Sequence, residues 1–132
     1  MSVTRRCYFA LAATTLLVAL AGSAQAPGIK RTLLQKFDIV GDNREAVQAI
    51  AEIAPGVAAG RHTHFGPEFG YVLEGSSLLE VDGEAPRTLK AGDSYLIPAG
   101  KIHDAKGVGD KPVKVLATYL VEKGKPLATP AP

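Results

Sequence analysis

The chain has 132 residues, a formal net charge of +2 and an apolar fraction of 46%. This length allows one ordinary domain, the apolar fraction excludes a wholly disordered chain, and the near-neutral charge gives no reason to expect nucleic acid as a partner. The first 26 residues hold two arginines and no acidic residue, whereas the remainder holds 13 basic and 13 acidic residues. The two segments therefore differ in their charge composition and are considered separately.

The first 26 residues predict a helical signal peptide. Arg5 and Arg6 precede a mostly apolar run, Tyr8–Leu20, and small residues follow it. A helix of that length reaches only about 20 Å, which is short of the roughly 30 Å hydrocarbon core of a bilayer. We therefore expect a cleaved signal, removed after Ala24 or Ala26, and a periplasmic or secreted protein with no membrane contact after cleavage.

The segment Thr4–Phe9 is also typical of a twin-arginine signal, which exports proteins already folded, so this route is an alternative to the general secretory one. Cys7 is the only cysteine and leaves with the signal. The mature chain then has no thiol, which excludes disulfides, thiolate metal ligands and cysteine nucleophiles.

Residues 27–123 predict a single all-β domain. The apolar residues alternate over short stretches separated by Gly- and Pro-containing turns, a pattern typical of a sandwich or small barrel. Arg44–Ile53 has some helical propensity, but the alternation favours a strand, and Asp82-Gly83 predicts a two-residue hairpin turn. The Pro-rich residues 124–132 predict a flexible tail. The expected strands are Leu33–Val40, Val47–Ile53, Phe69–Leu73, Leu78–Val81, Ser94–Ile97 and Val113–Val121.

One expected strand carries apolar residues on both faces. Phe69, Tyr71 and Leu73 share one face of the strand, whereas Gly70 and Val72 share the other. Something is therefore expected to cover the outer face, and a second subunit in a homodimer is the simplest candidate. The alternative is that these side chains lie partly exposed or under a loop.

The chain has three histidines, His62, His64 and His103. On an extended segment His62 and His64 point the same way, and Glu68 follows after a turn-like stretch. In an all-β fold, the distant His103 could face the same point from a neighbouring strand. Such a nitrogen and oxygen donor set suits one divalent transition metal: Fe, Mn, Ni, Co, Cu or Zn. His-x-His pairs also occur on solvated strands, and the spacing alone leaves that alternative open.

The residues around these histidines resemble the first motif of the cupin superfamily. That motif runs Gly, five residues, His-x-His, three residues, Glu, six residues, Gly. Here Gly56, His62, His64, Glu68 and Gly75 meet every spacing.

A second cupin motif follows sixteen residues later and resembles the spacing of small single-domain bacterial cupins. It runs Gly, five residues, Pro-x-Gly, two residues, His, three residues, Asn. Gly92, Pro98, Gly100 and His103 match it, and Gly107 stands where the family has Asn. This departure does not touch a ligand, but it leaves the local loop conformation open.

The resemblance implies a jelly-roll-like barrel with a mononuclear metal centre held by His62, His64, Glu68 and His103. It also implies a small-molecule substrate or ligand and an enzyme of the dioxygenase, isomerase, decarboxylase or lyase kind, with oxidoreductase chemistry slightly favoured. A non-enzymatic module that binds a small ligand or a metal is the alternative. The residues that would act in catalysis are not indicated.

We expect the exported form to begin at Gln25 or at Pro27, because signal peptidase cuts after small residues. Mass spectrometry of the protein recovered from the periplasm or the medium measures this start. Recovery of the chain with residues 1–26 intact would contradict the signal assignment.

Overall fold

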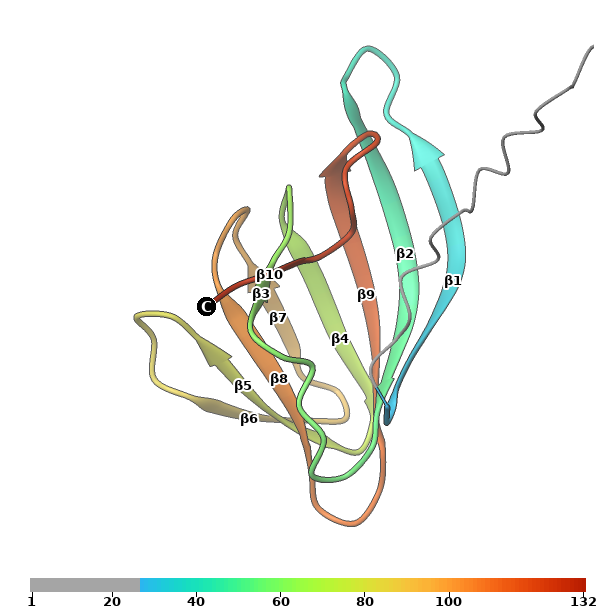
Figure 1. The fold of residues 1–132 in the computed structure, drawn as a ribbon. Helices are drawn as coiled ribbons and strands as arrows, with labels where there is room; N and C mark the ends of the chain where they lie inside the picture. Colours follow the sequence, from blue (N-terminus) through green and yellow to red (C-terminus); the bar gives the residue numbers. More distant parts are fainter. Residues whose placement is uncertain (1–26) are drawn as a thin grey trace, which may run out of the picture.

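A computed structural model describes residues 27–132, which form ten strands in two five-stranded sheets (Figure 1). The expected signal peptide lies outside these residues. No helix in the described part of the chain is long and apolar enough to span a bilayer. The strands are β1 (Ile29–Asp38), β2 (Arg44–Ile53), β3 (His62–Thr63), β4 (Glu68–Glu74), β5 (Ser76–Val81), β6 (Arg87–Lys90), β7 (Ser94–Ile97), β8 (His103–Val108), β9 (Val113–Glu122) and β10 (Thr129–Pro130).

The two sheets are antiparallel and pack face to face, so the expected all-β fold is confirmed. Sheet A has the order β1-β2-β9-β4-β7, and sheet B has the order β10-β3-β8-β5-β6. From β7 onward the chain alternates between the sheets, with β8 in sheet B between β7 and β9 in sheet A. Figure 1 shows the two layers, with the C-terminal segment crossing from the end of β9 to the edge of sheet B.

The core lies between the sheets and follows the two-residue period of the strands. In β9, Val113, Val115, Ala117, Tyr119 and Val121 are all buried and alternate with partly exposed residues. Burying one such aliphatic side chain contributes about 1.5–3 kcal/mol. The alternation in the sequence therefore fixes which face of each strand points into the barrel.

All six expected strands are present, and Arg44–Ile53 is a strand rather than a helix. β3, β6, β8 and β10 were not among the expected strands. The turn expected at Asp82-Gly83 is present, because the Glu84 N–H donates to the Val81 carbonyl at 2.9 Å and Gly83 has a φ of 81°. It is not a two-residue hairpin connection, however, since the last pair of the β5–β6 hairpin is Leu79 with Arg87. Val81 pairs with β8 instead, and Pro86 has no N–H to donate, so the connecting loop is longer.

Residues 124–132 contact the barrel. β10 pairs with β3, and Leu127 packs against the core. The backbone N–H of Ala131 donates to the Arg61 carbonyl at 2.9 Å, and the Arg61 guanidinium donates to the Pro132 carbonyl at 2.7 Å. Proline is compatible with this position because β10 is an edge strand. These contacts attach the segment to the barrel, and the flexibility expected from its composition stays a prediction.

The outer face of sheet A exposes large apolar side chains. Phe69 and Tyr71 on β4 are each 47% exposed, and Leu73 is 40% exposed. Leu96 on β7 lies opposite Phe69 and is 53% exposed. The homodimer expected from this face stays a prediction.

Gly107 is held where two backbone segments approach closely. It donates to the Val57 carbonyl and accepts from the Gly56 N–H, at 2.9 and 2.8 Å. A Cβ built on Gly107 would lie 2.4 Å from the Ala54 carbonyl oxygen, a distance that real side chains do not reach. The position where the family motif has Asn therefore has no room for a side chain in this protein.

We expect Gly107→Asn to lower the free energy of unfolding by about 1–3 kcal/mol, because the backbone of residue 54 would have to move. Gly109→Asn is the matched control, since Gly109 is exposed with open space around its Cβ position, and Asn tolerates its left-handed φ of 84°. Urea unfolding measures both. If both variants lost the same free energy of unfolding, the close approach of the Ala54 backbone would not be what excludes a side chain at residue 107.

Candidate metal centre

The three histidines converge inside the barrel. His62 on β3 lies directly opposite His103 on β8, and His64 follows just after β3. One ring nitrogen from each lies within 4.8 Å of the other two. The three residues are only 8%, 4% and 3% exposed. Extended backbone at residues 62–64 and the cross-strand pair therefore bring together side chains some forty residues apart in sequence.

Glu68 reaches the same point from the opposite sheet. It opens β4 in sheet A and is 5% exposed. Its Oε2 atom lies 2.9 Å from His64 Nε2 and 3.3 Å from His103 Nε2. The site thus joins the two sheets, with imidazoles from one side and a carboxylate from the other.

Each imidazole has its Nδ1 atom directed at a backbone carbonyl oxygen. His62 Nδ1 lies 2.6 Å from the Gly60 oxygen, and His103 Nδ1 lies 2.9 Å from the Lys101 oxygen. His64 Nδ1 contacts the oxygen of Leu127 in the C-terminal segment. Because a carbonyl can only accept, each Nδ1 carries a hydrogen, and in the neutral ring the lone pair is left on Nε2. This is the arrangement in which histidine binds a metal through Nε2.

His64 Nε2 shows that the four residues fit a cation. The atom is buried and makes no hydrogen bond, although Glu68 Oε2 is 2.9 Å away. A lone pair facing a carboxylate at that distance is unfavourable unless a positive charge lies between them. Ligands at right angles around an ion with bonds of about 2.1 Å are about 3 Å apart, which matches the 2.9 and 3.3 Å found here.

The surroundings of the site shift the pKa values of the histidines and of Glu68. Burial, which disfavours the charged imidazolium, lowers the pKa of His62 to about 4. Burial acts to raise the pKa of Glu68, but contacts with His103, His64 and Tyr95 outweigh it and hold that pKa well below its usual range. Burial acts to lower the pKa of His103, but its hydrogen bond to Glu68 prevails and raises it.

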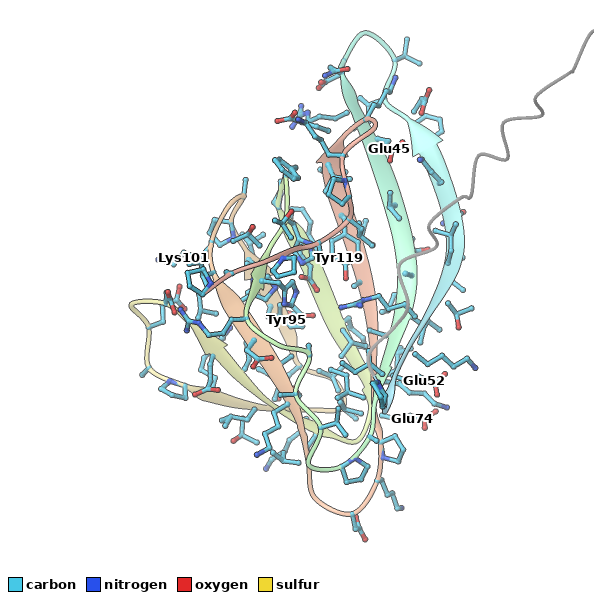
Figure 2. The ribbon with its side chains drawn as sticks, viewed as in Figure 1. Glu45, Glu52, Glu74, Tyr95, Lys101 and Tyr119 are labelled. Carbon is cyan, nitrogen blue, oxygen red and sulfur yellow. The ribbon has the colours of Figure 1, made fainter. Side chains whose placement is uncertain are left out.

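Two tyrosines of sheet A surround the carboxylate. Tyr95 on β7 donates its hydroxyl hydrogen to Glu68 Oε1 at 2.7 Å. Tyr119 on β9 lies opposite Glu68 in the sheet, and its ring centroid is 4.8 Å from that of His64. Burial and the negative Glu68 raise the pKa of both hydroxyls, so they act as hydrogen-bond donors. Figure 2 shows both side chains near the middle of the molecule, away from Glu52 and Glu74 at one end.

Three other polar side chains in or near the two motifs do not join the histidine cluster. Arg61 points away from the histidines and forms a two-pronged ion pair with Asp82, with both distances 2.9 Å. Tyr71 is on the outer face of sheet A. Lys101 contributes its backbone carbonyl to His103 rather than its ammonium group.

Sequence reasoning missed two contributors to the site. Tyr119 looked like one more apolar position in the alternation of β9, although that alternation does place it on the inner face. The Leu127 carbonyl is part of the backbone, so no pattern of side chains in the sequence could have indicated it.

Comparison with known proteins agrees with this geometry. Residues 49–119, more than half of the chain, match the family described as the cupin domain. The dimethylsulfoniopropionate lyase DddW of Ruegeria pomeroyi is 40% identical over 60 residues. The matched segment covers 46% of this chain and 39% of DddW, so it spans well under half of that relative.

Solved structures share the fold. An RmlC-like cupin from Shewanella frigidimarina is 26% identical, with a TM-score of 0.60 and coverage of 75% of this chain and 81% of that one. The dimethylsulfoniopropionate lyase DddQ of Ruegeria pomeroyi is 19% identical, with a TM-score of 0.64 and coverage of 78% and 51%. At these identities the likeness to DddQ shows the fold alone.

The family match, the two-sheet barrel and the buried histidines point to the same conclusion. A three-histidine cluster inside such a barrel indicates a single metal site. The chain belongs to the cupin family.

Proposed function

We propose that the protein is an exported, metal-dependent lyase that acts on a small organic molecule. The observation that carries the proposal is the convergence of three Nε2 atoms and one carboxylate, with each Nδ1 atom occupied by a backbone carbonyl. His62, His64, Glu68 and His103 would hold one divalent transition metal. The donor set accommodates Fe, Mn, Ni, Co, Cu or Zn.

The residues fit a catalytic ion better than a purely structural one. Four protein ligands leave two positions open on a six-coordinate ion, whereas a structural site is closed by its protein ligands. The ion would supply Lewis acidity toward a substrate oxygen. The chain itself fixes the donors, because Tyr95 orients Glu68 and the backbone carbonyls orient the rings.

Lyase chemistry is favoured over the dioxygenase chemistry that the motifs alone suggested. The curated relative DddW and the solved neighbour DddQ both bear the name dimethylsulfoniopropionate lyase. The relationship to DddW is 40% identity over 60 residues, which supports a related reaction on a small, charged organic molecule. A non-enzymatic binding module remains the second candidate and is an outcome of the test below.

Export to the periplasm or the medium is part of the proposal. It is supported by the two arginines and the apolar run Tyr8–Leu20, which precede the described barrel. The general secretory route and the twin-arginine route both deliver such a protein.

We expect the purified protein, loaded in turn with each of the six ions, to release dimethyl sulfide from dimethylsulfoniopropionate with at least one of them. His103→Ala should lose both the bound ion, measured by elemental analysis, and the dimethyl sulfide, measured by gas chromatography, because it removes one ligand of four. Lys106→Ala, at an exposed position of the same strand, is the control. Full metal retention in His103→Ala refutes the four-ligand site, and a bound ion without turnover favours the binding module.

Tyr95→Phe should weaken zinc binding by about tenfold or more, since it removes the hydrogen bond that orients Glu68 while the ring keeps its place over Gly70. Tyr71→Phe removes a hydroxyl from the outer face and should leave the affinity unchanged. Competition with a chromophoric chelator measures both affinities. An unaltered affinity in Tyr95→Phe would mean that Glu68 is oriented without its help.

A further inference from the structure

The outer face of sheet A is an apolar surface that the described residues leave open to solvent. Ile50, Leu116 and Tyr71 occupy neighbouring positions on β2, β9 and β4. Phe69 and Leu96 form part of the next row, on β4 and β7. Tyr71, Phe69 and Leu96 are exposed, and Ile50 and Leu116 are partly buried. Single exposed apolar side chains are ordinary, but a contiguous group with a polar border indicates an interaction site.

The polar side chains within this face are hydrogen-bonded to one another. Gln35 Nε2 donates to Gln48 Oε1 at 2.8 Å, and Gln48 Nε2 donates to Thr118 Oγ1 at 3.2 Å. A polar group that is buried without a partner costs about 1–3 kcal/mol. Because these three side chains already pair along the sheet, covering the face leaves fewer donors and acceptors to satisfy.

Four charged side chains border the apolar face at one end and alternate in sign. Lys30, Glu52, Lys114 and Glu74 lie side by side on β1, β2, β9 and β4, the four strands that Figure 1 shows next to one another. Lys30 Nζ lies 4.0 Å from Glu52 Oε1, and Lys114 Nζ lies 3.3 Å from Glu74 Oε1. Figure 2 shows Glu52 and Glu74 at this end of the molecule. The row reads positive, negative, positive, negative, so the same row in reverse is its electrostatic complement.

This order of signs selects one way of placing a second copy of the chain on the face. A two-fold axis parallel to the strands, between β2 and β9, reverses the row. Lys30 then faces Glu74 of the partner subunit. Glu52 faces Lys114 of the partner subunit. An axis along the row itself would instead bring each charge against its own copy, which is repulsive.

We propose that the outer face of sheet A binds a second copy of this chain in a two-fold dimer whose strands run parallel across the interface. The strand-parallel axis places Ile50 against Leu116 of the partner subunit at the centre, and such a pair of sheets packs in the aligned manner. The occupant is a second copy because the charges of the face complement their own reversal. The proposal is independent of the lyase reaction, since the face lies on the other side of sheet A from the histidine cluster.

The test measures the monomer–dimer equilibrium of the mature protein by sedimentation equilibrium over a concentration series. Tyr71→Lys puts a charge into the apolar face and should weaken the dimer about a hundredfold or more, because an unpaired charge would be buried. Leu33→Lys is the matched control and should leave the dimer unchanged. Leu33 is 61% exposed on the same sheet, but it lies opposite the buried Ala49 and therefore points to the inner side.

Charge reversal tests the position of the axis. Lys30→Glu and Glu74→Lys each place like charges together at two symmetry-related points, so each should weaken the dimer about tenfold or more. Mixed in equal amounts, the two variants should form a heterodimer of about wild-type affinity, because opposite charges then face each other at both points. Lys106→Glu changes the charge equally at an exposed position of sheet B, and it should have no effect on the dimer.

Three results would overturn the proposal: wild-type protein that stays monomeric over the whole series, a dimer that Tyr71→Lys leaves intact, or charge variants that associate no better when mixed than alone. The second result would place the dimer on another surface, such as the edge of β1. The third would exclude the strand-parallel axis. Tyr71, Lys30 and Glu74 are all exposed, so their replacement leaves the core in place. A dimer of this arrangement without lyase activity would refute the lyase reaction alone.

Discussion

The centre of this molecule depends on three backbone carbonyls that accept hydrogen bonds from three imidazoles. These acceptors belong to Gly60, Lys101 and Leu127, which lie in separate segments of the chain. Each one fixes a hydrogen on Nδ1 and so exposes Nε2 toward the same point. The path of the main chain therefore determines which ring nitrogen of each histidine faces the centre of the site. This explains how a barrel of short strands can hold a polar cluster in its interior without leaving the rings free to turn.

The site also joins the two layers of the fold. The histidines belong to sheet B and the segments beside it, whereas Glu68, Tyr95 and Tyr119 belong to sheet A. A cation shared by these donors would tie the sheets together at their centre, as the aliphatic core does around it. Stability and metal affinity are expected to be coupled for this reason, because a preformed site exists only when the sheets are packed.

Much of the fold could be predicted from the sequence, because short apolar stretches bounded by turn residues can be recognised from the local sequence. Val113–Val121 and Ser94–Ile97 are examples, and the strands found there agree with the expected ranges almost to the residue. The short strands β3 and β10 could not be predicted in this way. Each has two residues and exists only because a distant partner is in place, so their cause lies in tertiary structure.

In the site, too, some residues could be predicted from the sequence and others depend on tertiary structure. The cupin motifs indicate the four candidate ligands, whereas the His-x-His spacing alone leaves a solvated strand open. Tyr119 could not be assigned to the site from the sequence, because its place opposite Glu68 depends on the pairing of β9 with β4. Gly107 departs from the family motif for a reason that is also non-local, namely the approach of the Ala54 backbone.

The contact between His64 and Leu127 has a consequence for the order of events during synthesis. The acceptor is made 63 residues after the ring that it holds. A nascent chain that has emerged only as far as β9 already contains every imidazole, yet it lacks the group that sets the tautomer of one of them. The pocket for an ion is therefore complete only once Leu127 has been made and has packed onto the barrel, so loading of an ion would follow that step.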